Sequence, residues 1–477
     1  MASIETVTPT HWTARGEVEV PPPDRQKQGR AIQVFGGIPG ERADVRITSV
    51  GQNRSYGFWI GARSPSPDRV EPPCDRFGPC GGCPLMHLRP EAQYAVRRQN
   101  VRDALADEGL KDVAVGAFHA CPDGDAGFRH VVKLGFGMSD RNRLKVGAWA
   151  RNTRHVVPIP NCHVAAPVLR RVMASLAHHA IELDLWPWDP DTDRGVLRAA
   201  VLRASRSTGK VMITLVVGRR TKRLDELAEL VATNVGEVVG VWAHVNTDTG
   251  NSIFLRDADG VIGVQPLVGT DDLEETLLDV RYSMGPGDFF QTNPAVAEIV
   301  YKRTIERLEL VKDVPVIDLY SGVGGFALQA AKVTGWALGV EEIDGAVARA
   351  RSAARRNGIE GAEFVSDRVD LALPDIKRRL GDSHPVLTVN PARRGLEPGV
   401  VEGILGLEPR RIAYVSCNAT AMARDVRAFV EAGYRVNGEV ELFDMFPHTA
   451  HQEALIVLDA PAGSAEGKRA PRRKVVR

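Results

Sequence analysis

A cysteine and a glutamate near the C-terminal end of the chain could act as a nucleophile and its partner base. Cys417 follows an apolar run, residues 412–415, that predicts a strand, and Glu453 precedes the next such run, residues 455–458. A thiolate is a strong nucleophile, and a carboxylate can accept a proton. A lone cysteine after a strand is most often buried and inert. The pair therefore indicates catalysis only if both residues lie at the ligand-binding edge of one sheet.

A glycine-rich loop upstream predicts a nucleotide-type ligand at such an edge. Asp318 ends a short apolar strand, and Gly322 and Gly324 follow it just before a predicted helix. Glycines allow a sharp turn and a close approach of the backbone to a ligand. Glu341 ends the next predicted strand, where a carboxylate can accept hydrogen bonds from both ribose hydroxyls.

The residues around these glycines help to identify the ligand. Together with Ala327, Gly322 and Gly324 match the dinucleotide spacing, so the glycines alone do not exclude NAD. Asp318 favours S-adenosylmethionine, because its carboxylate can face the cationic methionine end and would repel a pyrophosphate. Gln291 follows two phenylalanines ahead of this domain, and that segment either packs or places Gln291 over the cofactor.

A methyl donor in the same sheet would give the cysteine and the glutamate separate roles. A thiolate can add to C6 of a uracil ring, which makes C5 a carbon nucleophile able to take a methyl group. The C5 proton must then leave to a base, and elimination of the thiol releases the product. Cys417 fits the attack and Glu453 fits the proton removal. His448 and His451 could form a zinc pair, but orienting or packing roles near the base fit them better.

A second group of cysteines predicts a metal centre. Cys74, Cys80 and Cys83 lie close together on a glycine-broken loop, and Cys162 could be a fourth ligand. Four thiolates suit tetrahedral zinc or a [4Fe–4S] cluster. Zinc knuckles usually pair two C-x-x-C arms and only one is present, so the spacing favours iron–sulfur, with zinc or no metal as alternatives. Cys121 has no evident partner and is expected to be structural.

The elements that must position these residues fall into distinct units. Short alternating runs over residues 12–68 predict a small barrel of the oligonucleotide-binding type. Residues 69–280 hold the cysteines and predict an α+β middle domain. Residues 281–460 alternate strand and helix, which predicts a doubly wound, Rossmann-like parallel sheet. The basic stretch 461–477 is expected to be disordered, with a possible role in holding RNA phosphates.

The composition is that of an ordinary globular protein. The chain has 477 residues, 43% hydrophobic and 25% charged, with a net charge of +1, so any basic surface must be local. It contains no apolar run of about eighteen residues and begins with a polar segment, so neither a membrane span nor a signal peptide is expected. We expect a cytoplasmic protein that is a monomer, with reduced thiols.

Taken together, these motifs resemble the S-adenosylmethionine-dependent RNA 5-methyluridine methyltransferases over residues 14–459. The resemblance implies that the first unit is an RNA-binding TRAM domain and that the cysteine group above holds a [4Fe–4S] cluster. It also implies that Cys417 is the nucleophile and Glu453 the proton acceptor. Gln291, Tyr320 and Glu341 are implied contacts of S-adenosylmethionine.

One cofactor position departs from the family pattern. That position usually reads Asp-Pro-Pro-Arg, and here the motif begins with Asn390. The change removes a charge but keeps a hydrogen-bonding group. Asn390, the two arginines after it and the residues around Cys417 look most like a branch that acts on 23S rRNA. That branch often lacks a TRAM unit, so the chain combines features.

The sequence thus predicts an RNA uridine-C5 methyltransferase, with 23S rRNA as the expected substrate and tRNA as the alternative. Two predictions of other classes compete with it. An iron–sulfur, NAD-linked oxidoreductase would bind nicotinamide and would not need Cys417 or Glu453. A non-catalytic RNA-binding factor would keep its role when Cys417 is replaced.

Overall fold

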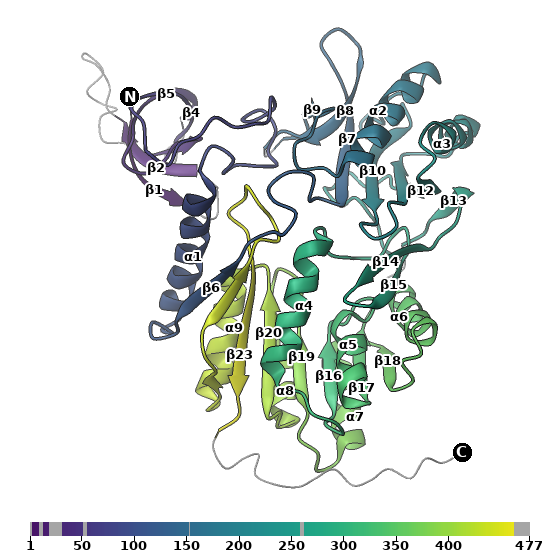
Figure 1. Ribbon diagram of the computed structural model, residues 1–477. Helices are drawn as coiled ribbons and strands as arrows, with labels where there is room; N and C mark the ends of the chain where they lie inside the picture. The colour runs from purple at the N-terminus through teal and green to yellow at the C-terminus, as the bar shows by residue number, and fades with distance from the viewer. Residues whose placement is uncertain are drawn as a thin grey trace.

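The computed structural model describes residues 2–8, 13–18, 31–50, 55–151, 153–257 and 262–461. The basic tail predicted for residues 461–477 lies outside these ranges except for its first residue. The described strands form an N-terminal barrel, a seven-stranded middle sheet, a two-stranded hairpin and a nine-stranded C-terminal sheet, which lies below the middle one in Figure 1. No described helix is long and apolar enough to cross a membrane.

The N-terminal unit is a closed barrel with the strand order β1-β2-β3-β5-β4. These strands are β1 Ala2–Thr8, β2 Thr13–Val18, β3 Ala31–Phe35, β4 Arg42–Val50 and β5 Ser55–Ser64. Ile32 and Val34 alternate inward and form its core with Ala43. The sequence predicted a small barrel here, but β1 lies before residue 12, where the predicted unit began.

The middle sheet has seven strands in the order β13-β12-β11-β10-β7-β8-β9. They are β7 Val131–Met138, β8 Leu144–Trp149, β9 Val156–Pro158, β10 Leu197–Ala204, β11 Val211–Val217, β12 Val238–Val245 and β13 Gln265–Gly269. Helices α2 Pro167–Glu182 and α3 Lys222–Asn234 bury their apolar faces against this sheet. The hairpin of β14 Leu273–Leu277 and β15 Val280–Met284 leads into the C-terminal part.

The C-terminal sheet has nine strands, and its main path runs β18-β17-β16-β19-β20-β23-β22-β6. The parallel strands are β16 Val316–Leu319, β17 Ala337–Glu341, β18 Ala362–Ser366, β19 Val386–Val389 and β20 Arg411–Ser416. The strands that complete it are β6 Val115–His119, β21 Arg435–Val436, β22 Val440–Phe443 and β23 Glu453–Asp459. The helices are α4 Pro294–Leu308, α5 Gly325–Thr334, α6 Asp344–Arg356, α7 Val369–Leu380, α8 Val400–Gly406 and α9 Ala419–Glu431. The predicted doubly wound sheet is confirmed.

Two N-terminal elements differ from their predicted place. The sequence assigned residues 69–280 to the middle domain, but α1 Pro90–Asp107 and β6 dock on the C-terminal sheet (Figure 1). Strand β6 pairs in parallel with β22, and α1 packs against α9. Burial explains the arrangement, because Val101, Leu105 and Val115 share the core of the C-terminal sheet.

Candidate active site

The strand register brings the cysteine and the glutamate together at one edge of the C-terminal sheet. Strand β23 runs antiparallel to β20, and Ser416 pairs with Ala454. Cys417 comes directly after Ser416, and Glu453 comes directly before Ala454, so the two candidate residues lie next to each other. The order of the parallel strands reverses on either side of β16, and ligands bind at such a switch point, outside the carboxyl ends of the strands.

Burial shapes the chemistry of both groups. Glu453 is 3% exposed, and burial raises the pKa of its carboxyl to about 8. Cys417 is half-buried, and burial raises the pKa of its thiol; the neighbouring Glu453 charge raises it further. A buried carboxyl with a pKa near neutrality is suited to act as a base or an acid.

Arg393 is a further residue of this site that the sequence analysis did not single out. The positive charge of its guanidinium lowers the pKa of the Cys417 thiol and also lowers the pKa of the Glu453 carboxyl. The Asn418 side chain donates to the Arg393 carbonyl at 2.7 Å, which ties this loop to the start of α9. The two adjacent arginines of the motif that begins at Asn390 were the available signal.

The glycine loop adopts the turn that its sequence predicts. Tyr320, Gly322 and Gly324 have φ values of 61°, 56° and 91°, all left-handed. A side chain at Gly324 would meet Phe364, whereas at Gly322 no atom lies within 4 Å of the place a Cβ would take. The carboxylate of Glu341 accepts from the backbone N–H of Gly322 at 3.0 Å, which fixes the loop against the end of β17.

Asp318 does not face an open site, contrary to the sequence-based expectation. The side chain is fully buried, and its two oxygens accept from the Thr388 hydroxyl at 2.6 Å and the Ala327 backbone N–H at 2.9 Å. Burial raises its pKa to about 7. The carboxyl therefore holds the beginning of α5 against β19 and so stabilises the glycine loop that precedes α5.

The remaining cofactor residues lie at or near the same edge. Tyr320 follows β16 and donates its hydroxyl to Glu397. Asn390 follows β19 and is half-buried, and its backbone N–H lies 3.4 Å from the carbonyl of Leu319. Gln291 is 7% exposed and stands in the segment that leads into α4.

The four cysteines of the predicted metal centre line one cavity of about 750 Å³ between the cysteine-bearing segment and the middle sheet. Its walls also carry cationic and aromatic side chains, namely Arg76, Phe77, Arg129, Lys133, Trp149 and Arg151. Burial raises the pKa of Cys80, Cys83 and Cys162. Among the described residues, no sulfur of these four cysteines lies within 4.8 Å of two other ligand atoms that are themselves this close together.

His448 has partners that fit an orienting role. Its Nδ1 lies 3.4 Å from Gln93 Nε2 and its Nε2 lies 2.9 Å from the Asp125 carbonyl. An amide nitrogen can only donate and a carbonyl can only accept, so Nδ1 accepts and Nε2 carries the proton. Asp125, His163 and His448 do offer ligand atoms within 4.8 Å, but this tautomer occupies both nitrogens of His448. His451 is not part of that group.

Comparisons with known proteins agree with this geometry. The family model described as tRNA (Uracil-5-)-methyltransferase matches residues 266–460. An uncharacterized RNA methyltransferase of Caldanaerobacter subterraneus subsp. tengcongensis is 31% identical over 435 residues, which cover 90% of this chain and 93% of that protein. Another from Listeria innocua is 30% identical over 441 residues, with 90% and 93% covered.

A solved structure extends the likeness to the whole fold. The crystal structure of Pyrococcus abyssi tRNA (uracil-54, C5)-methyltransferase in complex with S-adenosyl-L-homocysteine superposes with a TM-score of 0.72 at 26% identity. The match covers 96% of this chain and 100% of that one. The family resemblance predicted from the motifs is thereby confirmed, and the oxidoreductase alternative is not retained. The chain belongs to the S-adenosylmethionine-dependent RNA (uracil-5-)-methyltransferase family.

Proposed function

We propose that this enzyme methylates C5 of a uridine in RNA through a covalent adduct on Cys417. The observation that carries the proposal is the β20–β23 register, which sets the thiol beside the buried carboxyl of Glu453. The Cys417 thiolate forms a bond to C6, and the displaced π electrons make C5 nucleophilic. Arg393 favours the thiolate before the attack, because its positive charge lowers the pKa of the Cys417 thiol.

S-adenosylmethionine supplies the methyl group that C5 takes, and its sulfonium sulfur keeps the bonding electrons. The Glu453 carboxylate then removes the C5 proton. The electrons of the C–H bond restore the C5–C6 double bond, and the S–C6 bond breaks to return the thiolate. The target base must leave its stack to reach Cys417, since the thiol lies half-buried at the sheet edge.

The cofactor site we propose follows the carboxyl ends of three neighbouring strands. Glu341 would hold the ribose hydroxyls, while Tyr320, Gln291 and Asn390 would contact the rest of the molecule. Gly322 and Gly324 let the backbone approach the ligand, and the open space at Gly322 supports this assignment. Asp318 would act indirectly through the loop it supports.

We also propose that Cys74, Cys80, Cys83 and Cys162 hold a [4Fe–4S] cluster. All of them line one cavity. A tetrahedral zinc with bonds of about 2.3 Å would hold four thiolate sulfurs roughly 3.8 Å apart. No such close group exists among the described residues. Each cysteine of a cluster binds a different iron, so a cluster needs a wider spacing of the four sulfurs than one zinc ion does. The methylation chemistry needs no electron transfer.

The RNA target has two candidates. The motifs around Asn390 and Cys417 favour 23S rRNA. The solved relative acts on tRNA, and the matching family model also carries a tRNA description, which favours tRNA. Mapping 5-methyluridine in rRNA and tRNA from cells with and without the gene decides between them. If deletion of the gene removes no 5-methyluridine from either RNA, the proposal fails.

A further inference from the structure

The segment that precedes the catalytic glutamate is held in place by residues distant in the sequence. We call residues 444–452 the base loop, because they join β22 to β23 and end directly before Glu453. The loop is largely buried, with Asp444 at 3%, His448 at 3% and Thr449 at 7% exposure. His448 has a φ of 65°, a left-handed backbone that a residue other than glycine adopts only under constraint from its surroundings.

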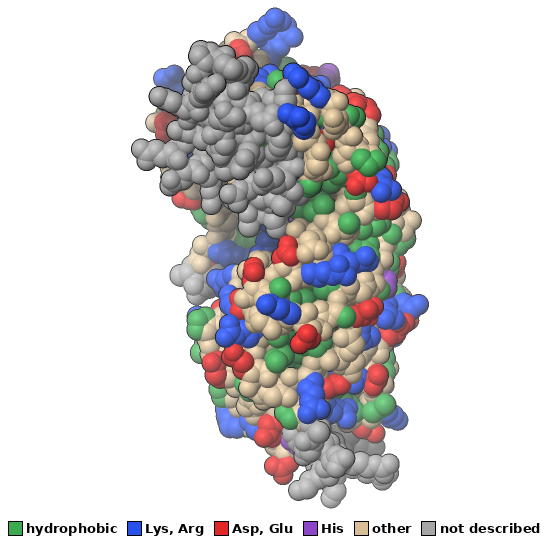
Figure 2. All heavy atoms as spheres, turned by 90° about the vertical axis from the view of Figure 1, so that its left-hand side faces the viewer, with side chains coloured by type: hydrophobic (Ala, Val, Ile, Leu, Met, Phe, Trp, Pro, Cys, Tyr) green, Lys and Arg blue, Asp and Glu red, His purple; other side chains and the backbone are tan. Residues whose placement is uncertain are grey.

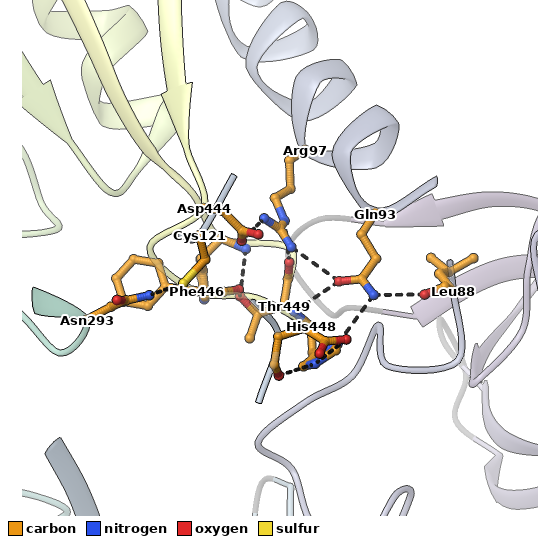
Figure 3. A network of polar contacts seen from close by, with 11 residues as sticks. Leu88, Gln93, Arg97, Cys121, Asn293, Asp444, Phe446, His448 and Thr449 are labelled. Carbon is orange, nitrogen blue, oxygen red and sulfur yellow. Dashed lines mark hydrogen bonds and ion pairs between the residues drawn. The ribbon is translucent and has the colours of Figure 1, made fainter. Parts of the chain in front are cut away.

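Arg97 of helix α1 ties two points of the base loop together (Figure 3). The side chain is fully buried, and its Nη1 lies 2.5 Å from Asp444 Oδ1. Its Nε donates to the carbonyl of Thr449 at 2.9 Å, and its Nη2 donates to Gln93 Oε1 at 3.2 Å. A buried guanidinium with these partners fixes the distance between the two parts of the loop that it contacts.

Gln93, one turn earlier on α1, holds the strained residue of the loop (Figure 3). Its Oε1 accepts from the backbone N–H of His448 at 3.0 Å. Its Nε2 donates to the Leu88 carbonyl at 2.8 Å and lies 3.4 Å from His448 Nδ1. The amide thus fixes the backbone and the ring of His448 together.

The cysteine-bearing segment also contacts the base loop. The backbone N–H of Leu85, two residues after Cys83, donates to the His448 carbonyl at 2.9 Å. Leu85, Leu88 and the barrel residue Ile38 pack with Ala450 of the loop in one small apolar cluster. Every one of these contacts comes from the N-terminal part of the chain, whereas the loop belongs to the C-terminal sheet.

We propose that Gln93 and Arg97 are positioning residues for proton removal, which they serve by holding the base loop so that Glu453 faces the C5 proton. The inference rests on the proposed function of Cys417 and Glu453. Cys417 stands on a different connection, between β20 and α9, and its register with β23 does not use the two α1 side chains. Loss of either side chain should therefore slow proton removal far more than attack at C6.

The test separates these two steps with two RNA substrates. Adduct formation with 5-fluorouridine RNA requires thiol attack and methyl transfer, but fluorine at C5 leaves no proton for the base to take. Turnover on uridine RNA requires every step. Gln93→Met keeps approximate side-chain length and removes the bonds to the loop. Arg97→Lys keeps the charge but replaces the forked guanidinium, which bonds Asp444 and Thr449 with separate nitrogens, by a single ammonium. Gln99→Met is the matched control, because Gln99 is exposed on the same helix and its side chain bonds Asp103 and no other residue in the described ranges.

Both variants should form the fluorouridine adduct at nearly the wild-type rate. Their turnover on uridine RNA should fall by about tenfold to a hundredfold, the cost of a displaced catalytic group. They should also accumulate a covalent protein–RNA complex on uridine RNA, as Glu453→Gln should. Gln99→Met should match the wild type in all three measurements.

Two results would overturn the positioning role. Turnover close to wild type in both variants would do so, and so would an equal loss of adduct formation and turnover, which indicates general destabilisation. If Arg97→Lys does not fold, as thermal unfolding would reveal, the same comparison on Gln93→Met decides. A wild-type enzyme that forms no adduct would instead count against the proposed function.

Discussion

At the residue scale, the proposed reaction centre combines two acidic groups, whose pKa values burial raises, with one cation that lowers both. Burial raises the pKa values of Cys417 and Glu453, and Arg393 lowers both. Without the cation, a thiolate and a carboxylate side by side would repel each other. Arg393 therefore sets how much of each group is in its reactive form near neutral pH.

The first prediction concerns pH. The pKa of Glu453 is about 8, so its base form grows as the pH rises toward that value. The kcat on uridine RNA should increase through about pH 8, and a rate profile across this range measures it. In Glu453→Gln the residual rate should no longer depend on the ionisation of residue 453. Its remaining pH dependence should come from the Cys417 thiol alone. One titration spans roughly two pH units. A wild-type rate that stays constant or falls from about pH 6 to about pH 8 would therefore contradict the role of Glu453 as the base.

The second prediction concerns Arg393. Replacement by Gln removes the cation, so the pKa values of Cys417 and Glu453 should rise and the rate profile should move to higher pH. At a pH below the pKa of Cys417, each unit by which this pKa rises lowers the fraction of thiolate about tenfold. Because Arg393 is exposed, the variant should fold normally. Arg378→Gln is the control, since that side chain is 76% exposed on α7. An unshifted profile for Arg393→Gln would exclude this role.

At the element scale, the C-terminal sheet explains why so much of the site could be predicted. Alternating apolar runs and glycines identify parallel strands and their carboxyl ends, where Glu341, Asn390 and Cys417 must lie. The sequence could not show that Asp318 turns inward, because the position of Thr388 on a neighbouring strand decides it. It also could not show Gln93, since only tertiary contacts bring α1 to the base loop.

The third prediction links the cysteine loop to catalysis. Cys83→Ser should lose bound iron and sulfide, measured by metal and sulfide analysis. It should also reduce turnover on uridine RNA, because Leu85 nearby donates to His448 of the base loop. Cys121→Ser is the control: Cys121 does not line the cysteine cavity, and serine can still accept from Asn293. Zinc in place of iron in the wild type, or full cluster content in Cys83→Ser, would contradict the cluster proposal.

At the scale of the whole molecule, charge is distributed locally. The net charge is only +1, and one face of the protein shows Lys and Arg side chains interspersed with Asp and Glu (Figure 2). Basic side chains also line the cysteine cavity, which lies between the cysteine-bearing segment and the middle sheet. Because the proposed cluster would fill the cavity itself, we expect RNA phosphates to contact the basic side chains that border it, such as Arg76 and Lys133. The barrel's predicted TRAM role in binding RNA stays a prediction.

The fourth prediction follows from that charge distribution. Lys133→Gln and Arg76→Gln should each weaken RNA binding and should lower the slope of log affinity against log salt by about one, as expected for a lost phosphate contact. Titration of RNA binding at several salt concentrations measures it. Arg378→Gln, far from the cavity on α7, should leave the slope unchanged. Unchanged slopes in both cavity variants would place the RNA backbone elsewhere.

Covalent capture on 5-fluorouridine RNA tests the central claim most directly. Enzyme, S-adenosylmethionine and this RNA should give a stable protein–RNA complex, and mass spectrometry of the digested complex should place the nucleotide on Cys417. Cys417→Ala should give none, while Glu453→Gln should still form it, because fluorine makes the base step impossible in every variant. A bound RNA that forms no adduct, or an adduct on another residue, would contradict the account.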